Sequence, residues 1–235
     1  MGIIHHKNLL KIKHKLVVSC QAEGDSPFNS PEGVAMFAIA AQQGGAGGIR
    51  TEGLEKTKRI KELVDLPVIG LIKNKFPDGT VRITRTVQEV EALYKLGVDI
   101  IAIDGTLRTV EGYNGPELIS YCKKIYPDIC ILADISTMEE AIACVKNCAD
   151  GITTALRGYT LETHDQLNDP VDICFIAELT RHFPGYPVIA EGKIKNLEQV
   201  KEITKSGVWS IIVGSVITRP HLITKDYVET MQQAL

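Results

Sequence analysis

The stretch LPVIGLIK, residues 66–73, is apolar from Pro67 to Ile72 and is followed at once by a lysine, Lys73. An unbroken apolar run is typical of a strand that is buried on both faces of a parallel sheet, because a strand with one wet face would alternate apolar and polar residues. Short runs of the same kind, rich in Val and Ile, return along the whole chain. They occupy residues 16–20, 47–50, 67–73, 99–104, 128–134, 150–156, 186–192 and 209–214.

The segments between these runs carry signals for helices. Ser30 stands before Pro31, which is a favourable first residue of a helix. Three further pairs have the spacing of a capping box or come close to it, namely Thr86 with Glu89, Thr137 with Glu140 and Asn196 with Gln199. Eight βα units in this order predict an α/β fold, a closed (β/α)8 TIM barrel formed as a single domain by residues 16–235. The N-terminal segment, residues 1–15, is expected to close the bottom of the barrel.

Composition and charge exclude several classes of protein. The 235 residues are 44% hydrophobic and 23% charged, with a formal net charge of -3. This balance is ordinary for a globular protein and provides no basic field for nucleic acid or for an anionic membrane surface. No apolar stretch reaches the roughly 18 residues that a membrane span needs. We therefore expect a cytoplasmic protein with no nucleic-acid partner and no membrane partner.

The six cysteines contain no C-x-x-C pair, and most of them lie inside apolar runs. This pattern predicts buried, reduced thiols. Cys144 and Cys148 are one helical turn apart, but a metal site there would lack further ligands in any recognisable pattern. The sequence therefore predicts no metal site.

Polar and charged residues follow most of the apolar runs. A TIM barrel builds its active site at the C-terminal ends of its strands, so we expect these side chains to converge on one solvent-accessible pocket. Salt bridges across the barrel top are the alternative for any single residue. The residues concerned are Gln21, Arg50, Lys73, Asp104, Asp134, Thr153, Thr154, Glu191, Gly214 and Ser215.

Two of these strand ends also carry glycines. Gly192, Gly214 and Ser215 follow the seventh and eighth runs, where barrels often bind phosphate through backbone N–H groups. Ordinary loop glycines are the alternative. The glycines between residues 44 and 48 precede a run instead, so they predict a turn into the second strand and no dinucleotide site.

The strand-end motifs resemble the N-acetylmannosamine-6-phosphate 2-epimerase family over nearly the whole chain. The motifs are VVSCQA at 17–22, GGIR at 47–50, LPVIGLIK at 66–73, ADIST at 133–137, TTALRGYT at 153–160, VIAEG at 188–192 and VGSVITRP at 213–220. The resemblance implies a TIM barrel, usually dimeric and without a redox cofactor. It also implies interconversion of N-acetylmannosamine 6-phosphate and N-acetylglucosamine 6-phosphate in sialic acid breakdown.

The resemblance also implies roles for individual residues. The family's catalytic lysine and glutamate fall on Lys73 and Glu191. Positions around the sugar fall on Gln21, Arg50, Asp134, Thr153 and Arg157, and the phosphate loops fall on Gly192, Gly214 and Ser215. Two positions depart from the family pattern. Ser215 replaces the more usual second glycine, and Arg157 stands where a small or different polar residue is expected, so its role stays open.

Epimerisation next to an acetamido group requires removal of the proton on C2, which is acidic only when C1 is an open-chain carbonyl. Lys73 is the candidate base, provided that burial and the neighbouring Arg50 lower its pKa. Glu191 is the second acid or base, and it serves either the opposite face of C2 or ring opening. Asp134 is expected to orient Lys73 or to accept a hydrogen bond from the substrate.

Three other interpretations remain open at this stage. Lys73 and Glu191 would form a plain salt bridge if neither were catalytic. A lysine at a strand end beside a carboxylate also suits a Schiff-base aldolase or lyase. A catalytically silent sugar-phosphate sensor is the third, because fold does not fix function.

Overall fold

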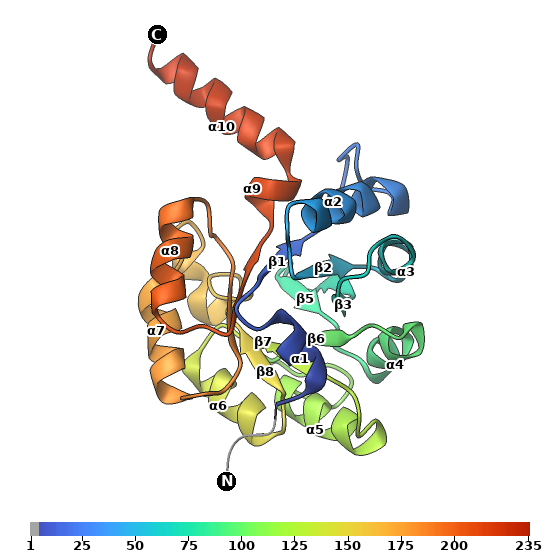
Figure 1. The fold of residues 1–235 in the computed structure, drawn as a ribbon. Helices are drawn as coiled ribbons and strands as arrows, with labels where there is room; N and C mark the ends of the chain where they lie inside the picture. The colour runs from blue at the N-terminus through green and yellow to red at the C-terminus, as the bar shows by residue number, and fades with distance from the viewer. Residues whose placement is uncertain (1–4) are drawn as a thin grey trace.

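The computed structural model describes residues 5–235 and contains a closed barrel of parallel strands inside a ring of helices (Figure 1). The strands are β1 (Leu16–Ser19), β2 (Gly48–Glu52), β3 (Val68–Leu71), β4 (Lys73–Lys75), β5 (Val81–Ile83), β6 (Ile100–Asp104), β7 (Ile131–Asp134), β8 (Gly151–Thr153), β9 (Val188–Glu191) and β10 (Ser210–Val213). The helices are α1 (Lys7–Ile12), α2 (Pro31–Gln43), α3 (Leu54–Leu63), α4 (Val87–Leu96), α5 (Gly115–Ile125), α6 (Met138–Lys146), η1 (Leu161–Gln166), α7 (Ile173–His182), α8 (Leu197–Lys205), α9 (Ser215–Thr218) and α10 (Pro220–Gln233).

The barrel closes in the order β1-β10-β9-β8-β7-β6-β3-β2, with every neighbouring pair parallel. Each of its eight strands lies within or overlaps one of the eight apolar runs, so the predicted TIM barrel is confirmed. The glycines before β2 form the predicted turn, in which Gly45 has a φ of +86°.

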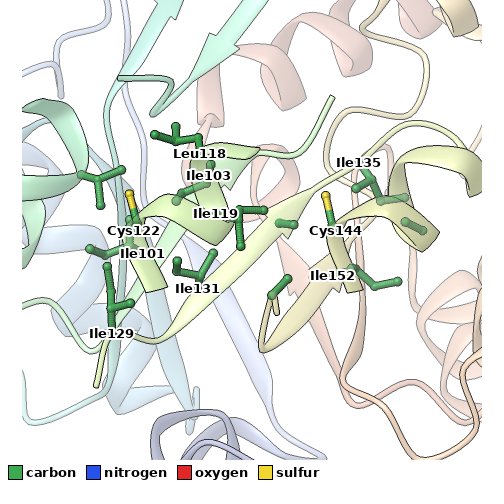
Figure 2. Close-up of a cluster of buried hydrophobic side chains, with 14 of the residues drawn as sticks. Ile101, Ile103, Leu118, Ile119, Cys122, Ile129, Ile131, Ile135, Cys144 and Ile152 are labelled. Atoms are coloured by element: carbon green, nitrogen blue, oxygen red, sulfur yellow. The ribbon is translucent and has the colours of Figure 1, made fainter. Parts of the chain in front are cut away.

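The continuous apolarity of the runs has a direct structural cause. Successive residues of a strand point to opposite faces of the sheet. In β6, Ile100 and Ala102 pack inside the barrel, whereas Ile101 and Ile103 pack outward against the helices. Figure 2 shows this outer layer, in which Leu118, Ile119 and Cys122 of α5 belong to the same cluster as the outward side chains of β6 and β7. Both faces are therefore apolar.

The predicted helix starts are confirmed. Ser30 accepts a hydrogen bond from the N–H of Gly33, and α4, α6 and α8 begin with complete capping boxes at Thr86, Thr137 and Asn196. A fourth capping box, Asn114 with Glu117, starts α5 and was not predicted.

The N-terminal helix α1 packs against the barrel interior. Leu9 and Ile12 are fully buried in the cluster that fills the barrel, and the indole N–H of Trp209 donates to the carbonyl of Leu9 at 2.9 Å. A segment that closes one end of the barrel needs contacts of this kind. Closure of the barrel bottom by this segment stays a prediction. Residues 1–4 of the predicted closing segment lie outside the described residues.

The short hairpin of β4 and β5 was not predicted. It leaves the barrel directly after β3 and pairs Lys73 with Ile83 in antiparallel register. Arg108 holds it in place, since its guanidinium donates to the hydroxyl of Thr80 at 2.8 Å and stacks on the ring of Phe76. The C-terminal end of β3 is therefore covered by an extra element that carries Lys73.

The last helix, α10, extends away from the barrel instead of packing on it (Figure 1). None of its side chains is buried, and Leu222, Tyr227, Val228 and Met231 are exposed apolar residues on it. No helix within residues 5–235 is long and apolar enough to span a membrane.

All six cysteines are free thiols. Cys20, Cys122, Cys130 and Cys144 are buried, as expected, but Cys148 and Cys174 are exposed, so the prediction of buried thiols is wrong for these two. Cys148 lies beyond the end of α6 with a φ of +69°, and Cys174 lies on the outer face of α7.

Candidate active site

A cavity of about 750 Å³ opens at the C-terminal ends of the barrel strands. Side chains of a strand point alternately to its two faces, so a residue two positions beyond an inward-pointing apolar residue also points inward. Leu71 and Ile189 point into the barrel, so Lys73 and Glu191, two residues further on, face the same side. The residues from the predicted site that line this cavity are Gln21, Arg50, Lys73, Glu191, Gly192, Gly214 and Ser215.

The floor of the cavity is an ion cluster centred on Arg50, whose side chain is 2% exposed. Its guanidinium binds both carboxylate oxygens of Asp134, at 2.6 and 3.1 Å, and lies 3.1 Å from Oε2 of Glu191. Burial alone would lower the pKa of Arg50, but the two carboxylates outweigh burial and raise it above its ordinary value. We call Arg50, Asp134 and Glu191 the floor cluster.

Glu191 is the most exposed member of the floor cluster, with 13% of its side chain exposed, and it lines the cavity. Burial raises its pKa to about 7, a rise that Arg50 opposes and the Asp134 carboxylate reinforces. The hydroxyl of Thr153 donates a hydrogen bond to Oε2 of Glu191 at 3.3 Å. A carboxyl group that titrates near neutrality in a cavity suits an exchange of protons with a ligand.

The rim of the cavity carries a second, more exposed ion cluster. Nζ of Lys73 donates to Oε1 of Glu23 at 2.5 Å, and Nη2 of Arg219 lies 3.3 Å from the same oxygen. The three side chains are 29%, 42% and 30% exposed. We call Lys73, Glu23 and Arg219 the rim cluster.

The expected surroundings of Lys73 are therefore wrong in two respects. Of the two roles expected for Asp134, orienting Lys73 is not observed, because Asp134 is fully buried and engaged with Arg50 while the carboxylate on Lys73 is Glu23. A hydrogen bond from the substrate to Asp134 stays a prediction. Lys73 is also less buried than expected, because it stands on the hairpin that leaves the barrel and not inside the barrel. The plain salt bridge between Lys73 and Glu191 is not formed, since the basic partner of Glu191 is Arg50.

The side of the cavity formed after β9 and β10 combines glycine backbone, at Gly192 and Gly214, with the basic residues Lys193, Lys195 and Arg219. Gly192 has a φ of +95°, which favours glycine, and a Cβ on Gly214 would lie 3.1 Å from Cβ of Ser19. Ser215 is the first residue of α9, directly after Gly214. Arg219, at the junction of α9 and α10, adds a positive charge on this side.

The remaining predicted residues differ in how close they come to the cavity. The side-chain amide of Gln21 lines it and donates to Ser19 at 3.1 Å, while Thr153 is buried behind Glu191. Arg157 does not line it. Its guanidinium donates to Asp172 and to the carbonyl of Ser136, and it borders a neighbouring cavity of about 540 Å³ that shares Glu191 and Gly192.

Asp104 and Thr154 also lie apart from the main cavity. Asp104 is buried, and its carboxylate accepts from Thr106 and from Arg108, so it belongs to the network that holds the hairpin. The hydroxyl of Thr154 bridges the backbone of Glu191, donating to its carbonyl and accepting from its N–H.

Sequence reasoning missed seven charged residues of the cavity, namely Glu23, Glu52, Lys75, Asp169, Lys193, Lys195 and Arg219. Arg219 stands inside the motif VGSVITRP, and Glu23 follows Gln21 by two residues, so both were within reach of a search for charges near strand ends. Within residues 5–235, no group of three His, Cys, Asp or Glu side chains is arranged to hold a metal ion.

The fold of the chain is similar to solved structures. An N-acetylmannosamine-6-phosphate 2-epimerase from Clostridium perfringens superposes with a TM-score of 0.87 at 37% identity, over 98% of this chain and 99% of that one. A thiamine phosphate pyrophosphorylase from Pyrococcus furiosus shares only the fold, at a TM-score of 0.60 and 19% identity over 89% of both chains.

The sequence comparisons point to the same family. A relative from Shouchella clausii (strain KSM-K16) is 41% identical over 97% of this chain and 100% of its own length. A relative from Clostridioides difficile (strain 630) is 40% identical over 94% and 98%. Both are named "Putative N-acetylmannosamine-6-phosphate 2-epimerase". Residues 34–233 match the family model described as "Putative N-acetylmannosamine-6-phosphate epimerase". The chain therefore belongs to the N-acetylmannosamine-6-phosphate epimerase family.

Proposed function

We propose that this chain interconverts N-acetylmannosamine 6-phosphate and N-acetylglucosamine 6-phosphate by moving the proton on C2, a step in the breakdown of sialic acid. The observation that carries the proposal is the presence of Lys73 and Glu191 in one cavity, at the ends of β3 and β9, with the pKa of Glu191 raised to about 7. Two acid–base groups are what inversion of a C–H centre requires.

The chemistry starts from the open-chain sugar, in which the aldehyde at C1 makes the C2 proton acidic. One group takes the proton, and the electron pair of the C–H bond moves into an enolate whose negative charge rests on the C1 oxygen. The second group then returns a proton to the opposite face of C2. A cation close to the C1 oxygen stabilises the enolate.

In this proposal Lys73 and Glu191 are the two acid–base groups, and Arg50 holds the sugar oxygens. Asp134 acts through Arg50, which it fixes with two hydrogen bonds. Gln21 contacts the sugar side, and Thr153 acts through Glu191, to which its hydroxyl donates. The backbone at Gly192, Gly214 and Ser215 receives the 6-phosphate together with Arg219. Arg157 contributes indirectly, since its guanidinium holds Asp172 and the carbonyl of Ser136.

The test is the reaction of N-acetylmannosamine 6-phosphate in heavy water, followed by proton NMR without added cofactor. Transfer to a solvent-exchanging side chain predicts that the N-acetylglucosamine 6-phosphate formed carries deuterium at C2. Product with full protium at C2, formed only when NAD is added, would contradict the proposal. Trapping of a covalent adduct by borohydride would indicate the Schiff-base lyase instead. Absence of any turnover would indicate the sugar-phosphate sensor.

We further propose that the chain acts as a homodimer. An exposed helix with apolar residues such as Tyr227 and Met231 needs a covering surface, and no part of residues 5–235 buries it. A second copy that exchanges α10 would cover it at little cost. Light scattering should give a dimer for the wild type and a monomer for the double variant Tyr227→Asp, Met231→Asp; a wild-type monomer at micromolar concentration would contradict this.

A cytoplasmic location is our last proposal for the chain as a whole. It is supported by the six free thiols, of which Cys148 and Cys174 are exposed and would be oxidised in an oxidising compartment. Fractionation of cells that express the protein tests it, and recovery in the membrane or secreted fraction would contradict it.

A further inference from the structure

We propose that Arg108 is a positioning residue for the reaction, because it fixes the outer end of the β4–β5 hairpin to the barrel and thereby holds Lys73 in place. This inference rests on the proposed function of Lys73 as an acid–base group. Arg108 is not among the residues that line the cavity, and neither the strand ends nor the family motifs pointed to it.

The hairpin forms one wall of the cavity and carries Lys73. At its base, the N–H of Ile72 donates to the hydroxyl of Thr84 at 3.0 Å, and the N–H of Thr84 donates to the carbonyl of Ile72 at 2.8 Å. A hairpin of two short strands is only marginally stable by itself, so its outer end needs a further attachment. The hairpin residues that line the cavity are Lys73, Asn74, Lys75, Gly79, Val81 and Ile83.

Arg108 provides this attachment through three contacts with the hairpin. Its Nη1 donates to the hydroxyl of Thr80 at 2.8 Å, and its Nη2 donates to the carbonyl of Val81 at 3.3 Å. The central carbon of the guanidinium lies 3.9 Å from the centre of the Phe76 ring. Phe76 and Thr80 lie in the turn between β4 and β5, and Val81 begins β5. The contacts are therefore made at the end of the hairpin that is farthest from its base.

The same guanidinium is bound to the barrel by buried groups. Nη2 also donates to Oδ2 of Asp104 at 3.1 Å, and Nε donates to the hydroxyl of Thr106 at 3.0 Å. Asp104 and Thr106 are fully buried, and so is Arg85, which donates to the backbone carbonyl of Arg108. A planar guanidinium with five donors can bind both sides at once. Arg108 thus connects the end of β6 to the outer end of the hairpin.

A purely structural role for Arg108 would be to neutralise the buried carboxylate of Asp104. A lysine at this position separates the two roles. Its ammonium group can pair with Asp104, but as a compact charge it cannot also bind Thr80 and stack on Phe76. We therefore expect Arg108→Lys to fold and to lose the connection between barrel and hairpin.

Kinetics give the first readout. In Arg108→Lys, kcat should fall by about 10–100-fold, because a small misplacement of an acid–base group slows the chemical step strongly. KM for N-acetylmannosamine 6-phosphate should stay within about threefold, since the proposed phosphate contacts lie on other loops. A role confined to neutralising Asp104 would leave kcat of Arg108→Lys unchanged.

Lys123→Met is the matched control. Lys123 pairs with Asp150 at the start of β8, at the opposite end of the barrel from the cavity. Its side chain is 16% exposed, close to the 13% of Arg108, so the two substitutions remove ion pairs of similar burial. The kcat of Lys123→Met should equal that of the wild type.

Hydrogen exchange of the backbone amides in residues 73–83, followed by mass spectrometry, gives the second readout and does not require turnover. In Arg108→Lys these amides should exchange at least about tenfold faster than in the wild type, while those of β7 and α6 stay unchanged. Phe76→Leu removes the stacking without touching the barrel, so it should change exchange and kcat in the same direction by a smaller factor. It replaces Arg108→Lys if that variant does not fold.

The inference is overturned if the folded variant keeps the kcat of the wild type, or if exchange in residues 73–83 is unchanged. It is also overturned if Lys123→Met loses as much kcat, because the loss would then follow from stability and not from the hairpin. If the wild type places no deuterium at C2, the proposed function fails, and hydrogen exchange still decides whether Arg108 fixes the hairpin.

Discussion

The floor and the rim of the cavity are both ion clusters, but they differ in exposure. In the floor cluster Arg50 and Asp134 are 2% and 0% exposed, whereas in the rim cluster Lys73 and Glu23 are 29% and 42% exposed. An ion pair near water is screened and contributes little to stability, while breaking a buried pair leaves an uncompensated charge. The floor cluster therefore keeps a fixed geometry, whereas the rim cluster can rearrange at little cost in stability.

This contrast predicts that a rim substitution affects catalysis far more than stability. Lys73→Met should lower turnover by at least about 10³-fold, because it removes one of the two proposed acid–base groups. Binding of the sugar phosphate should stay within about tenfold, since the proposed phosphate contacts lie on other loops. Steady-state kinetics and calorimetric titration measure the two quantities.

The free energy of unfolding of Lys73→Met should change by no more than about 1 kcal/mol, as for other exposed ion pairs. More than a few per cent of residual activity would remove Lys73 from the mechanism. A loss of several kcal/mol in stability would break the distinction between rim and floor.

Substitution in the floor cluster should act on stability first. Asp134→Ala leaves the buried guanidinium of Arg50 with Glu191 as its remaining carboxylate partner, so we expect a loss of about 3–5 kcal/mol in the free energy of unfolding. Urea denaturation at equal protein concentration measures it. Glu23→Gln, which removes a rim carboxylate, is the matched control and should cost about 1 kcal/mol or less. Equal losses in the two variants would contradict the comparison.

The floor cluster should also make stability depend on pH through Glu191. Its pKa in the folded protein, about 7, lies above the ordinary value of 4.5, so the folded state holds this proton more tightly than the unfolded state does. The stability that the group contributes is complete below about pH 4.5 and is lost as the pH rises through 7.

Glu191→Gln does not titrate, so its stability relative to the wild type should increase between pH 4.5 and 7, by on the order of 3 kcal/mol. Denaturation of both proteins at pH 5, 6, 7 and 8 measures the difference. If the difference in the free energy of unfolding between the two proteins is the same at pH 5 and pH 8, the pKa of Glu191 is not raised.

The smallest effect is expected at the β10 side of the cavity. Ser215→Gly restores the more usual family pattern and leaves the backbone N–H groups in place, so kcat/KM should stay within about twofold. Gly192→Ala is the informative control, because a φ of +95° strains any residue with a Cβ, and its activity should fall clearly. A large loss in Ser215→Gly would show that the hydroxyl itself holds the phosphate.

Much of the fold was determined by the sequence alone. The runs such as LPVIGLIK predicted the strands because a strand covered on both faces needs an apolar residue at every position, as Ile100 and Ile101 illustrate by packing on opposite sides of β6. Capping boxes such as Thr86 with Glu89 predicted helix starts, since they depend on residues only three apart. The hairpin of β4 and β5 was missed because its strands are three residues long and carry no apolar run.

The sequence also determined which residues stand at the strand ends, but only the tertiary structure decided how they pair. Arg50 and Asp134 are 84 positions apart and Lys73 and Glu23 are 50 apart, and no local pattern links residues at such distances. The partner of each charge follows from the closure of the barrel, which brings the ends of β2, β7 and β9 together, and from the hairpin, which lifts Lys73 toward the loop of Glu23. Charge pairing depends on distance in space, and that distance is fixed only when the strands close.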